Sequence, residues 1–207
     1  MTHELPPVET LGDADADEVV DVLCEAFRDY PVMRYVLGQD RSADPGGLRA
    51  LVRYFVMARV LRGETMLGIG PPSDLEGAAL ISRPDSVRSP PGLAALRERL
   101  WERLGDAARA RYEAFGAATA PFAVDVPHIH LNMIGVRDRV RGRGVGRALI
   151  ERVHALSAGD ETSEGVTLTT ELPSNVPLYE HFGYSVVGRA RVAPELETWG
   201  FYRADPT

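Results

Sequence analysis

Apolar positions along the chain recur with two spacings, and each spacing predicts a different element. Spacings of three and four residues gather side chains on one side of a helix, and they predict helices within 13–27, 48–55, 93–104, 108–115 and 145–156. Runs rich in β-branched and apolar residues predict strands at 8–11, 65–69, 77–82, 129–136, 166–171, 184–189 and 198–203. The first helix is expected to end before Pro31. The pattern therefore predicts one mixed α/β domain over residues 1–207.

A glycine-rich loop separates the strand at 129–136 from the helix that follows it. Its sequence is Arg-Gly-Arg-Gly-Val-Gly-Arg at 141–147. Glycine lets the backbone turn sharply and approach a ligand closely. A helix that begins near Val145 also presents unpaired N–H groups and the positive end of its dipole at the same place. Because both features favour an anion, the sequence predicts a phosphate-binding loop.

Two common phosphate-binding motifs do not fit this loop. A Walker A motif ends in Gly-Lys-Ser/Thr, and the chain contains no lysine, so its 23 Lys and Arg residues are all Arg. A dinucleotide-binding Gly-x-Gly-x-x-Gly motif counted from Gly142 would need its last glycine where Arg147 stands. The lack of lysine also excludes pyridoxal-phosphate enzymes of the usual Schiff-base kind.

A second motif lies later in the chain, Asn-Val-Pro-Leu-Tyr-Glu-His-Phe-Gly-Tyr at 175–184. Asn175 is expected to cap a short helix whose first turn contains Pro177. Gly183 is expected to end that helix in the left-handed conformation. Asn175 and Tyr179 stand four residues apart, so the pattern places both on one helix face.

Together the two motifs resemble those of the GNAT superfamily of N-acetyltransferases, whose loop pattern Gln/Arg-x-x-Gly-x-Gly/Ala is met by Arg141, Gly144 and Gly146. The resemblance implies the GNAT fold, a twisted, mixed and mostly antiparallel sheet flanked by helices, here with a helical insertion. It also implies acetyl-coenzyme A as co-substrate, with its pyrophosphate on the loop and its pantetheine arm along the preceding strand. The residues expected to bind it are Ile134, Gly135, Val136, Arg141, Gly142, Arg143, Gly144, Val145, Gly146, Arg147 and Asn175. Tyr179 is expected to protonate the leaving thiolate.

The sequence Ala-Phe-Arg-Asp-Tyr-Pro-Val-Met-Arg at 26–34 resembles the puromycin N-acetyltransferase family within that superfamily. This resemblance implies that Asp29 and Tyr30 contact the amine acceptor, although they could instead cap the first helix. Thr169 stands where those enzymes have Glu, so puromycin itself is not predicted as the acceptor. The helical insertion, about 86–127, is expected either to line the acceptor pocket, or to cover the sheet or form a dimer contact.

The general base is predicted from polar residues on the strand at 129–136. His128, His130 and Asn132 alternate, so they point to one face. Histidine titrates in the range that proton abstraction from an ammonium needs. We expect His130 to be the base, with His128 contacting the substrate. A structural histidine is the competing interpretation, and Asp125, Glu171 or an ordered water are lesser candidates.

Composition narrows the function further. The net charge of −7 argues against nucleic acid, which is bound through Lys and Arg at its phosphates. The first 20 residues show no signal-peptide pattern and no apolar run is long enough to span a membrane, so a cytoplasmic protein without a membrane partner is expected. The single Cys24 excludes an internal disulfide, and no metal site is expected.

These observations predict an N-acetyltransferase that moves an acetyl group from acetyl-coenzyme A to a primary amine of a small molecule by direct attack. A peptide or protein acceptor is one alternative, and a catalytically silent acyl-coenzyme A sensor is another. An Arg-Gly RNA-binding protein is disfavoured because the loop lacks interleaved aromatic residues. The chain is expected to be a monomer or a homodimer.

Overall fold

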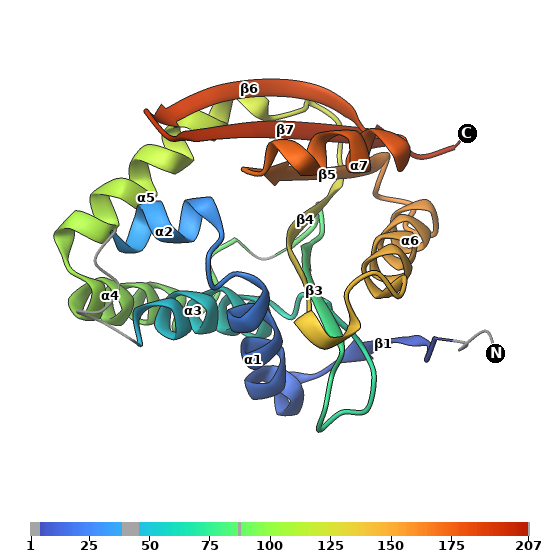
Figure 1. Cartoon of the computed structure of the whole chain (residues 1–207), viewed down its shortest axis with the longest axis horizontal. Helices are drawn as coiled ribbons and strands as arrows, with labels where there is room; N and C mark the ends of the chain where they lie inside the picture. The colour runs from blue at the N-terminus through green and yellow to red at the C-terminus, as the bar shows by residue number, and fades with distance from the viewer. Residues whose placement is uncertain (1–4, 39–45, 87, 207) are drawn as a thin grey trace.

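A computed structural model describes residues 5–38, 46–86 and 88–206. They form one seven-stranded sheet in the order β1-β2-β3-β4-β5-β7-β6, shown in Figure 1. The strands are β1 (Val8–Leu11), β2 (Met66–Ile69), β3 (Gly77–Ser82), β4 (Ile129–Val136), β5 (Gly165–Thr170), β6 (Ser185–Ala193) and β7 (Leu196–Ala204). Only the β4–β5 pairing is parallel. The predicted mixed, mostly antiparallel sheet is therefore confirmed.

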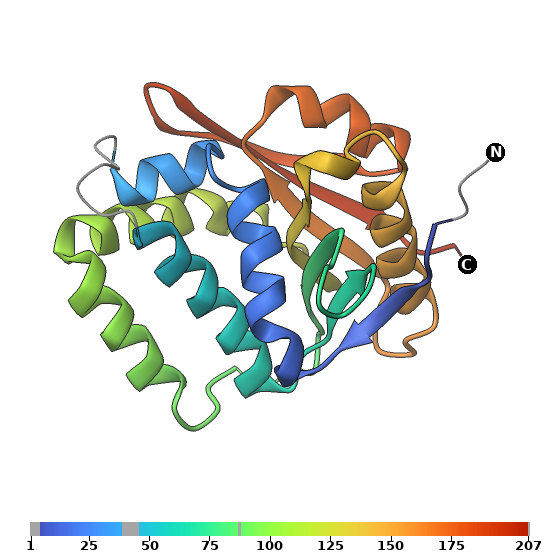
Figure 2. The same cartoon turned by 60° about the horizontal axis from the view of Figure 1, so that its bottom comes forward.

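Helices cover both faces of the sheet, as Figures 1 and 2 show. The α-helices are α1 (Ala16–Ala26), α2 (Pro31–Leu37), α3 (Gly47–Arg62), α4 (Leu93–Leu104), α5 (Asp106–Thr119), α6 (Val145–Ala158) and α7 (Val176–His181). Short 3-10 turns lie at Asp13–Asp15, Ala120–Phe122, Asp138–Val140 and Pro173–Asn175. Helices α1 to α5 lie on one side of the central strands, and α6 lies on the other side.

Each face of the sheet has its own apolar core. On the α1 and α3 side, Val19 and Leu23 are fully buried, as their four-residue spacing predicts. On the α6 side, Leu149 and Val153 are fully buried against β4 and β5. At about 25 cal/mol per Å² of buried apolar surface, these stripes contribute most of the stability of the fold.

Strand β4 contains an irregularity that its sequence does not reveal. Met133 pairs with Leu80 of β3, whereas Leu131 pairs with the next residue, Ile81, so Asn132 is left out of the register. Such an extra residue bends a strand and increases its local twist. The parallel pairing with β5 extends only over Ile129–Leu131. Beyond that point β4 and β5 separate, and their separation creates the space for a site.

Three local expectations need correction. Helix α1 ends at Ala26, before Pro31 as expected, but the pattern did not predict α2, which begins at Pro31 because a proline's missing N–H is harmless at the first helical position. Strands β6 and β7 extend further than 184–189 and 198–203, and they meet in a tight turn at 194–195. Asn175 stands at the start of α7, but its side chain forms no capping hydrogen bond. None of the helices formed by the described residues has both the length and the apolar content that crossing a membrane requires.

Candidate active site

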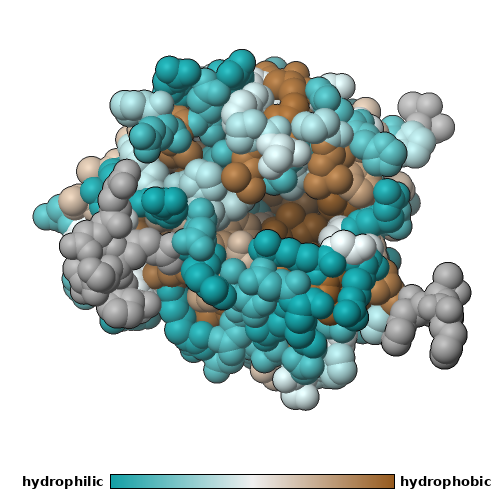
Figure 3. All heavy atoms as spheres, viewed as in Figure 1, coloured by the Kyte–Doolittle hydropathy of each residue, from teal (hydrophilic) through white to brown (hydrophobic). Residues whose placement is uncertain are grey.

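A cavity of about 400 Å³ lies where β4 and β5 separate. Figure 3 shows the middle of this face hollowed, with apolar residues inside the hollow. Side chains from α2, α3, α5, β4 and the segment after β5 line it. The insertion therefore contributes to the cavity wall through α5, where Tyr112 and Phe115 lie.

A buried carboxyl group, Glu171, lies in this wall one residue beyond β5. The residue is 6% exposed, and the Thr198 hydroxyl donates a 2.8 Å hydrogen bond to its Oε1. Burial raises the pKa of Glu171 to about 7, and hydrogen bonds from Thr198 and Tyr30 offset part of the rise. A carboxyl group with this pKa is half ionised near neutral pH, which suits it to accept a proton.

Tyr30 joins the first helical region to the end of β5. Its hydroxyl shares a 2.9 Å hydrogen bond with Thr170 Oγ1 and accepts one of 3.2 Å from the Glu171 N–H. Asn175 Nδ2 donates to the same Thr170 oxygen at 3.1 Å. Burial, followed by the charge of Glu171, raises the pKa of Tyr30. The hydroxyl is thus held un-ionised, beside the carboxyl group, in the cavity wall.

Tyr179 and Asn175 both line the cavity, which confirms that the two residues share one helix face. Tyr179 is 6% exposed, and its ring lies 5.5 Å from that of Phe201 and 5.8 Å from that of Tyr184. Burial, with the charge of Glu171 second, raises the pKa of Tyr179 to about 12. The phenol therefore keeps its proton at neutral pH and is able to donate it.

The two histidines proposed from the sequence occupy different places. His130 lines the cavity, and its Nδ1 lies 2.9 Å from Thr167 Oγ1. Burial, and then the nearby His128 and Arg59, lower the pKa of His130 to about 4. His128 lies against its own loop, with Nδ1 2.6 Å from the Val126 carbonyl, and it does not line the cavity. It lines a neighbouring hollow of about 540 Å³, which His130 and Arg62 also line.

The glycine loop has the geometry predicted for anion binding. Gly142 and Gly144 adopt φ values of 76° and 92°, in the left-handed region that favours glycine. Helix α6 begins at Val145, as expected. The N–H groups of its first turn therefore have no partners within the helix. A phosphate placed there would meet these donors and the positive end of the helix dipole.

Two of the arginine side chains in this loop form ion pairs with neighbouring carboxylates. Arg141 pairs with Asp138 at 2.9 Å. Arg147 pairs with Glu151 at 3.5 Å, and its guanidinium lies 5.2 Å from the centre of the Phe182 ring. Arg143 is exposed. The backbone of the loop, rather than these side chains, is the feature best arranged for a phosphate.

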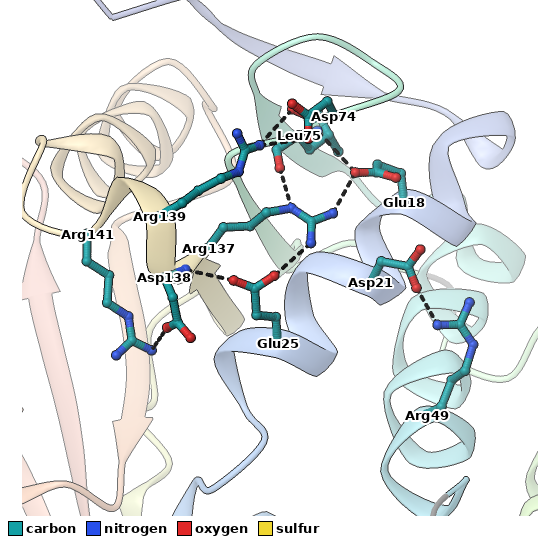
Figure 4. Close-up of polar contacts among 10 residues, drawn as sticks. All are labelled: Glu18, Asp21, Glu25, Arg49, Asp74, Leu75, Arg137, Asp138, Arg139 and Arg141. Carbon is teal, nitrogen blue, oxygen red and sulfur yellow. Dashed lines mark hydrogen bonds and ion pairs between the residues drawn. The ribbon is translucent and has the colours of Figure 1, made fainter.

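A clamp formed by Arg137 fixes the start of this loop, as Figure 4 shows. Its guanidinium donates to Glu18 at 2.7 Å and to Glu25 at 2.8 Å, both on α1, and to the Leu75 carbonyl at 2.8 Å. The other oxygen of Glu25 accepts from the Asp138 N–H at 2.8 Å. The side chain of Arg137 is 16% exposed. Multiple charge-assisted bonds of this kind hold the loop against α1 and the β2–β3 turn.

The remaining predicted residues divide between the cavity and its surroundings. Ile134 lines the cavity, together with Asn132. A Cβ at Gly135 would lie 2.7 Å from that of Ala26, so this glycine allows α1 to pack closely against β4. Asp29 is exposed, and it does not belong to the described cavity lining, unlike its neighbour Tyr30.

Sequence reasoning ranked Glu171 low and did not select Thr170 or Thr198. A signal existed for Glu171, a carboxylate placed directly after a buried strand and four residues before Asn175. Its burial and its bond to Thr198 depend on β7, which reaches β5 from the far end of the chain. No pattern in the sequence around Glu171 predicts that contact.

Residues 97–186 match the family model of the acetyltransferase (GNAT) domain. A structure from Corynebacterium glutamicum, described as histone acetyltransferase HPA2 and related acetyltransferase, is 22% identical over 99% of this chain and 98% of its own, with a TM-score of 0.73. Arylalkylamine N-acetyltransferase 2 from Aedes aegypti is 18% identical over 96% of this chain and 98% of its own, with a TM-score of 0.63.

Arabidopsis thaliana NAA60, solved in complex with acetyl-CoA, is 16% identical over 95% of this chain and 97% of its own, with a TM-score of 0.54. At these identities the structural matches show the fold, and this chain has the GNAT fold. Together with the family-model match, they indicate an acyltransferase.

Proposed function

We propose that this protein is an N-acetyltransferase, a single catalytic domain that moves the acetyl group of acetyl-coenzyme A to a primary amine of a small molecule. The observation that carries the proposal is the cavity itself. It brings a carboxyl group of raised pKa, Glu171, and a protonated phenol, Tyr179, to the place where β4 separates from β5. Those are the two proton-handling groups that amide formation from a thioester requires.

Acetyl-coenzyme A fits the separation between the strands. The N–H groups at the start of α6 would hold its pyrophosphate, with the two left-handed glycines shaping the turn. Beyond Leu131, the edge of β4 that faces β5 pairs with no strand among the described residues. The backbone near Ile134 and Val136 would therefore pair with the pantetheine arm as an added strand does. A β4 N–H near the thioester carbonyl would stabilise the oxyanion by about 3 kcal/mol.

The acetyl transfer proceeds by direct attack. Glu171 accepts a proton from the acceptor's ammonium group, and the free amine attacks the thioester carbonyl carbon. A C–N bond forms, the carbonyl oxygen takes up the negative charge, and the C–S bond breaks as that charge returns. Tyr179 donates its proton to the departing sulfur, and the proton held by Glu171 replaces it. The nitrogen of the new C–N bond still carries one proton too many, and Glu171, ionised again, accepts this second proton and releases it to water. Of the two protons that the ammonium nitrogen loses, one therefore ends on the thiol and the other in solvent.

The raised pKa of Tyr179 does not oppose this step. A thiol in water has a pKa near 8.5, well below about 12 for Tyr179. The leaving sulfur, however, emerges into the same buried cavity, and desolvation raises the pKa of a thiolate as it does that of a phenolate. The difference in pKa between the two groups at the moment of transfer is therefore smaller than the difference between Tyr179 and a thiol in water.

Glu171 is favoured over His130 as the base. With a pKa of about 4, His130 is neutral at physiological pH but would be a weak acceptor of an ammonium proton. The pKa of Glu171, about 7, matches the working pH. His130 remains a cavity residue whose bond to Thr167 fixes its ring.

Several features favour a small acceptor over a peptide. The cavity volume of about 400 Å³ falls within the range of small-molecule sites. Helix α5 adds the rings of Tyr112 and Phe115 to the cavity wall, which gives the cavity apolar surface suited to a small molecule. The likeness of residues 26–34 to puromycin N-acetyltransferases also favours a small acceptor, and Tyr30 of this segment lines the cavity.

Calorimetry with acetyl-coenzyme A, alongside a thiol-release screen of small primary amines that includes puromycin, tests the proposal. We expect binding, and turnover with at least one small amine. Binding without turnover on small amines, but with turnover on a peptide library, would replace the acceptor class. Binding without any turnover would favour a sensor, and absence of binding would refute the function of the loop.

A further inference from the structure

Two arginines at the end of α3, Arg59 and Arg62, line the cavity. The side chain of Arg59 is 7% exposed, forms an ion pair with Glu64, and donates from Nη1 to Ser82 Oγ at 2.7 Å. Arg62 donates from Nη2 to the Arg88 carbonyl at 3.2 Å. The Nε atoms of both arginines are buried and have no hydrogen-bond partner among the described residues.

Buried donors without partners are rare, and each costs free energy unless something else binds it. A third such atom, Nε of Arg152, lies on α6 and does not line either hollow. What distinguishes Arg59 and Arg62 is that both line the same cavity as Glu171. Two unpartnered guanidinium donors in one cavity wall point to an oxygen acceptor that belongs to the ligand.

The charges nearby favour an anionic acceptor. Glu64, whose side chain is 2% exposed, neutralises Arg59. The one hydrogen bond described for Arg62 goes to a neutral carbonyl. His130, which also lines this region, is neutral because its pKa is lowered to about 4. The wall around the two arginines thus carries an excess positive charge, and a carboxylate or phosphate pairs well with a guanidinium fork.

Strand register places these arginines at the opposite end of the cavity from Glu171. Arg59 is bonded to Ser82, which pairs with His130, and His130 pairs with Thr167 of β5. From Thr167 to Glu171 the chain advances four residues, about 13 Å at 3.3 Å per residue. The two ends of the cavity are therefore far enough apart for a ring to lie between a ligand group bound at one end and a ligand group bound at the other.

Aromatic side chains lie along this path. Phe55 and Tyr54 precede Arg59 by about one turn of α3, and both line the cavity. The ring of Tyr112 from α5 lies 6.2 Å from that of Phe55. Rings at this distance pack directly against each other, so they present an apolar wall on which another ring can lie in an offset or edge arrangement.

We propose that the acceptor is a primary amine joined through an aromatic ring to an anionic oxygen group, a carboxylate or a phosphate, which Arg62 and Arg59 bind while Glu171 receives the amine. This inference rests on the proposed acetyltransferase function. Arg62 is the specificity-determining residue to test, because replacing Arg59 would also strand the buried charge of Glu64.

The test compares matched acceptors in the thiol-release assay. The probes are 4-(2-aminoethyl)benzoate, its isosteric isopropyl analogue 2-(4-isopropylphenyl)ethylamine, O-phosphotyramine and tyramine. In the wild type, we expect kcat/KM for at least one anionic probe to exceed that of its neutral counterpart by about tenfold or more. Whichever anion is preferred identifies the group as carboxylate or phosphate.

The variants are Arg62→Met and, as matched control, Arg152→Met, which removes an equally unpartnered Nε outside the cavity. Arg62→Met should lower kcat/KM for the anionic probe by roughly 10- to 100-fold and leave the neutral probe nearly unchanged. Arg152→Met should change neither. The inference is overturned if neutral probes are preferred, or if Arg62→Met affects both probes equally. Failure of the proposed function would look different, because the protein would then either not bind acetyl-coenzyme A in calorimetry or release no thiol with any probe, anionic or neutral.

Discussion

Replacing the Glu171 carboxyl group by an amide tests both its environment and its role. Glu171→Gln preserves shape and removes the ionisation. Because burial raises the pKa of Glu171 from 4.5 to about 7, folding favours its protonated form. At 1.36 kcal/mol per pKa unit, this shift corresponds to about 3 kcal/mol, and at 6% exposure little solvent screening reduces it.

The sign of the effect follows from the direction of the shift. A raised carboxyl pKa contributes stability that is fully present below 4.5 and is lost as the pH rises through about 7. Urea unfolding between about pH 4.5 and about pH 8 measures it. The free energy of unfolding of the wild type should fall relative to that of Glu171→Gln by about 3 kcal/mol over this range. His130, whose lowered pKa acts in the opposite direction as the pH falls from 6.5, is common to both proteins.

The same variant tests the catalytic role. As general base, Glu171 should give the wild-type pH–rate profile an acidic limb near pH 7. Glu171→Gln should lower kcat/KM by roughly 10²- to 10⁴-fold and remove that limb, with the affinity for acetyl-coenzyme A retained. Parallel stability curves would refute the reasoning about burial. An unaltered acidic limb would refute the assignment of the base.

Four other substitutions address the rest of the site. Thr198→Val removes a hydrogen bond that lowers the pKa of Glu171, so the acidic limb should move to higher pH, and a limb that stays in place would contradict this. Tyr179→Phe should lower kcat about 100-fold with little change in Kd for acetyl-coenzyme A; wild-type turnover would eliminate it as the acid. Gly144→Asp places a carboxylate and a side chain at a φ of 92°, so calorimetry should find cofactor binding abolished. Arg137→Gln leaves two carboxylates without their partner, so urea unfolding should show a loss of stability of about 3 kcal/mol. The variant should also weaken cofactor binding, because the loop becomes less rigid. Unchanged affinity would mean that the loop keeps its conformation without Arg137.

The sequence predicted best those parts of the fold that depend on local chemistry. The two glycines at 142 and 144 require a left-handed backbone, and the helix stripe from Val145 onward needs a sheet to cover it. A sharp turn at these glycines and the helix start near Val145 were both predicted, and so was the left-handed Gly183, whose φ is 85°, because glycine content and 3.6-residue periodicity are local properties. The hairpin of β2 and β3 followed for the same reason.

What could not be predicted depends on contacts between distant segments. The contacts of Glu171 with Tyr30 and Thr198 join residues that lie 141 and 27 positions away in sequence, and their hydrogen bonds offset part of the rise in the pKa of Glu171 that burial causes. Asn175 illustrates the opposite error. Its position suits a helix cap, but Thr170 lies close enough to accept its Nδ2 hydrogen, and this bond replaces the cap.

The irregularity in β4 explains why strict alternation of residues along the strand predicts the wrong side-chain directions at the site. Leu131 packs in the core on the α6 side, whereas Met133, two residues later, packs in the core on the α1 side. In a regular strand both would face the same way. The unpaired Asn132 absorbs this reversal, so both cores stay filled while β4 turns away from β5. Deletion of Asn132 would make Leu131 and Met133 adjacent, opposite the adjacent Ile81 and Leu80, so the later residues would keep their faces but the strand would lose its local bend. Asn132 therefore allows β4 to fill both cores and also to separate from β5, and that separation creates the site.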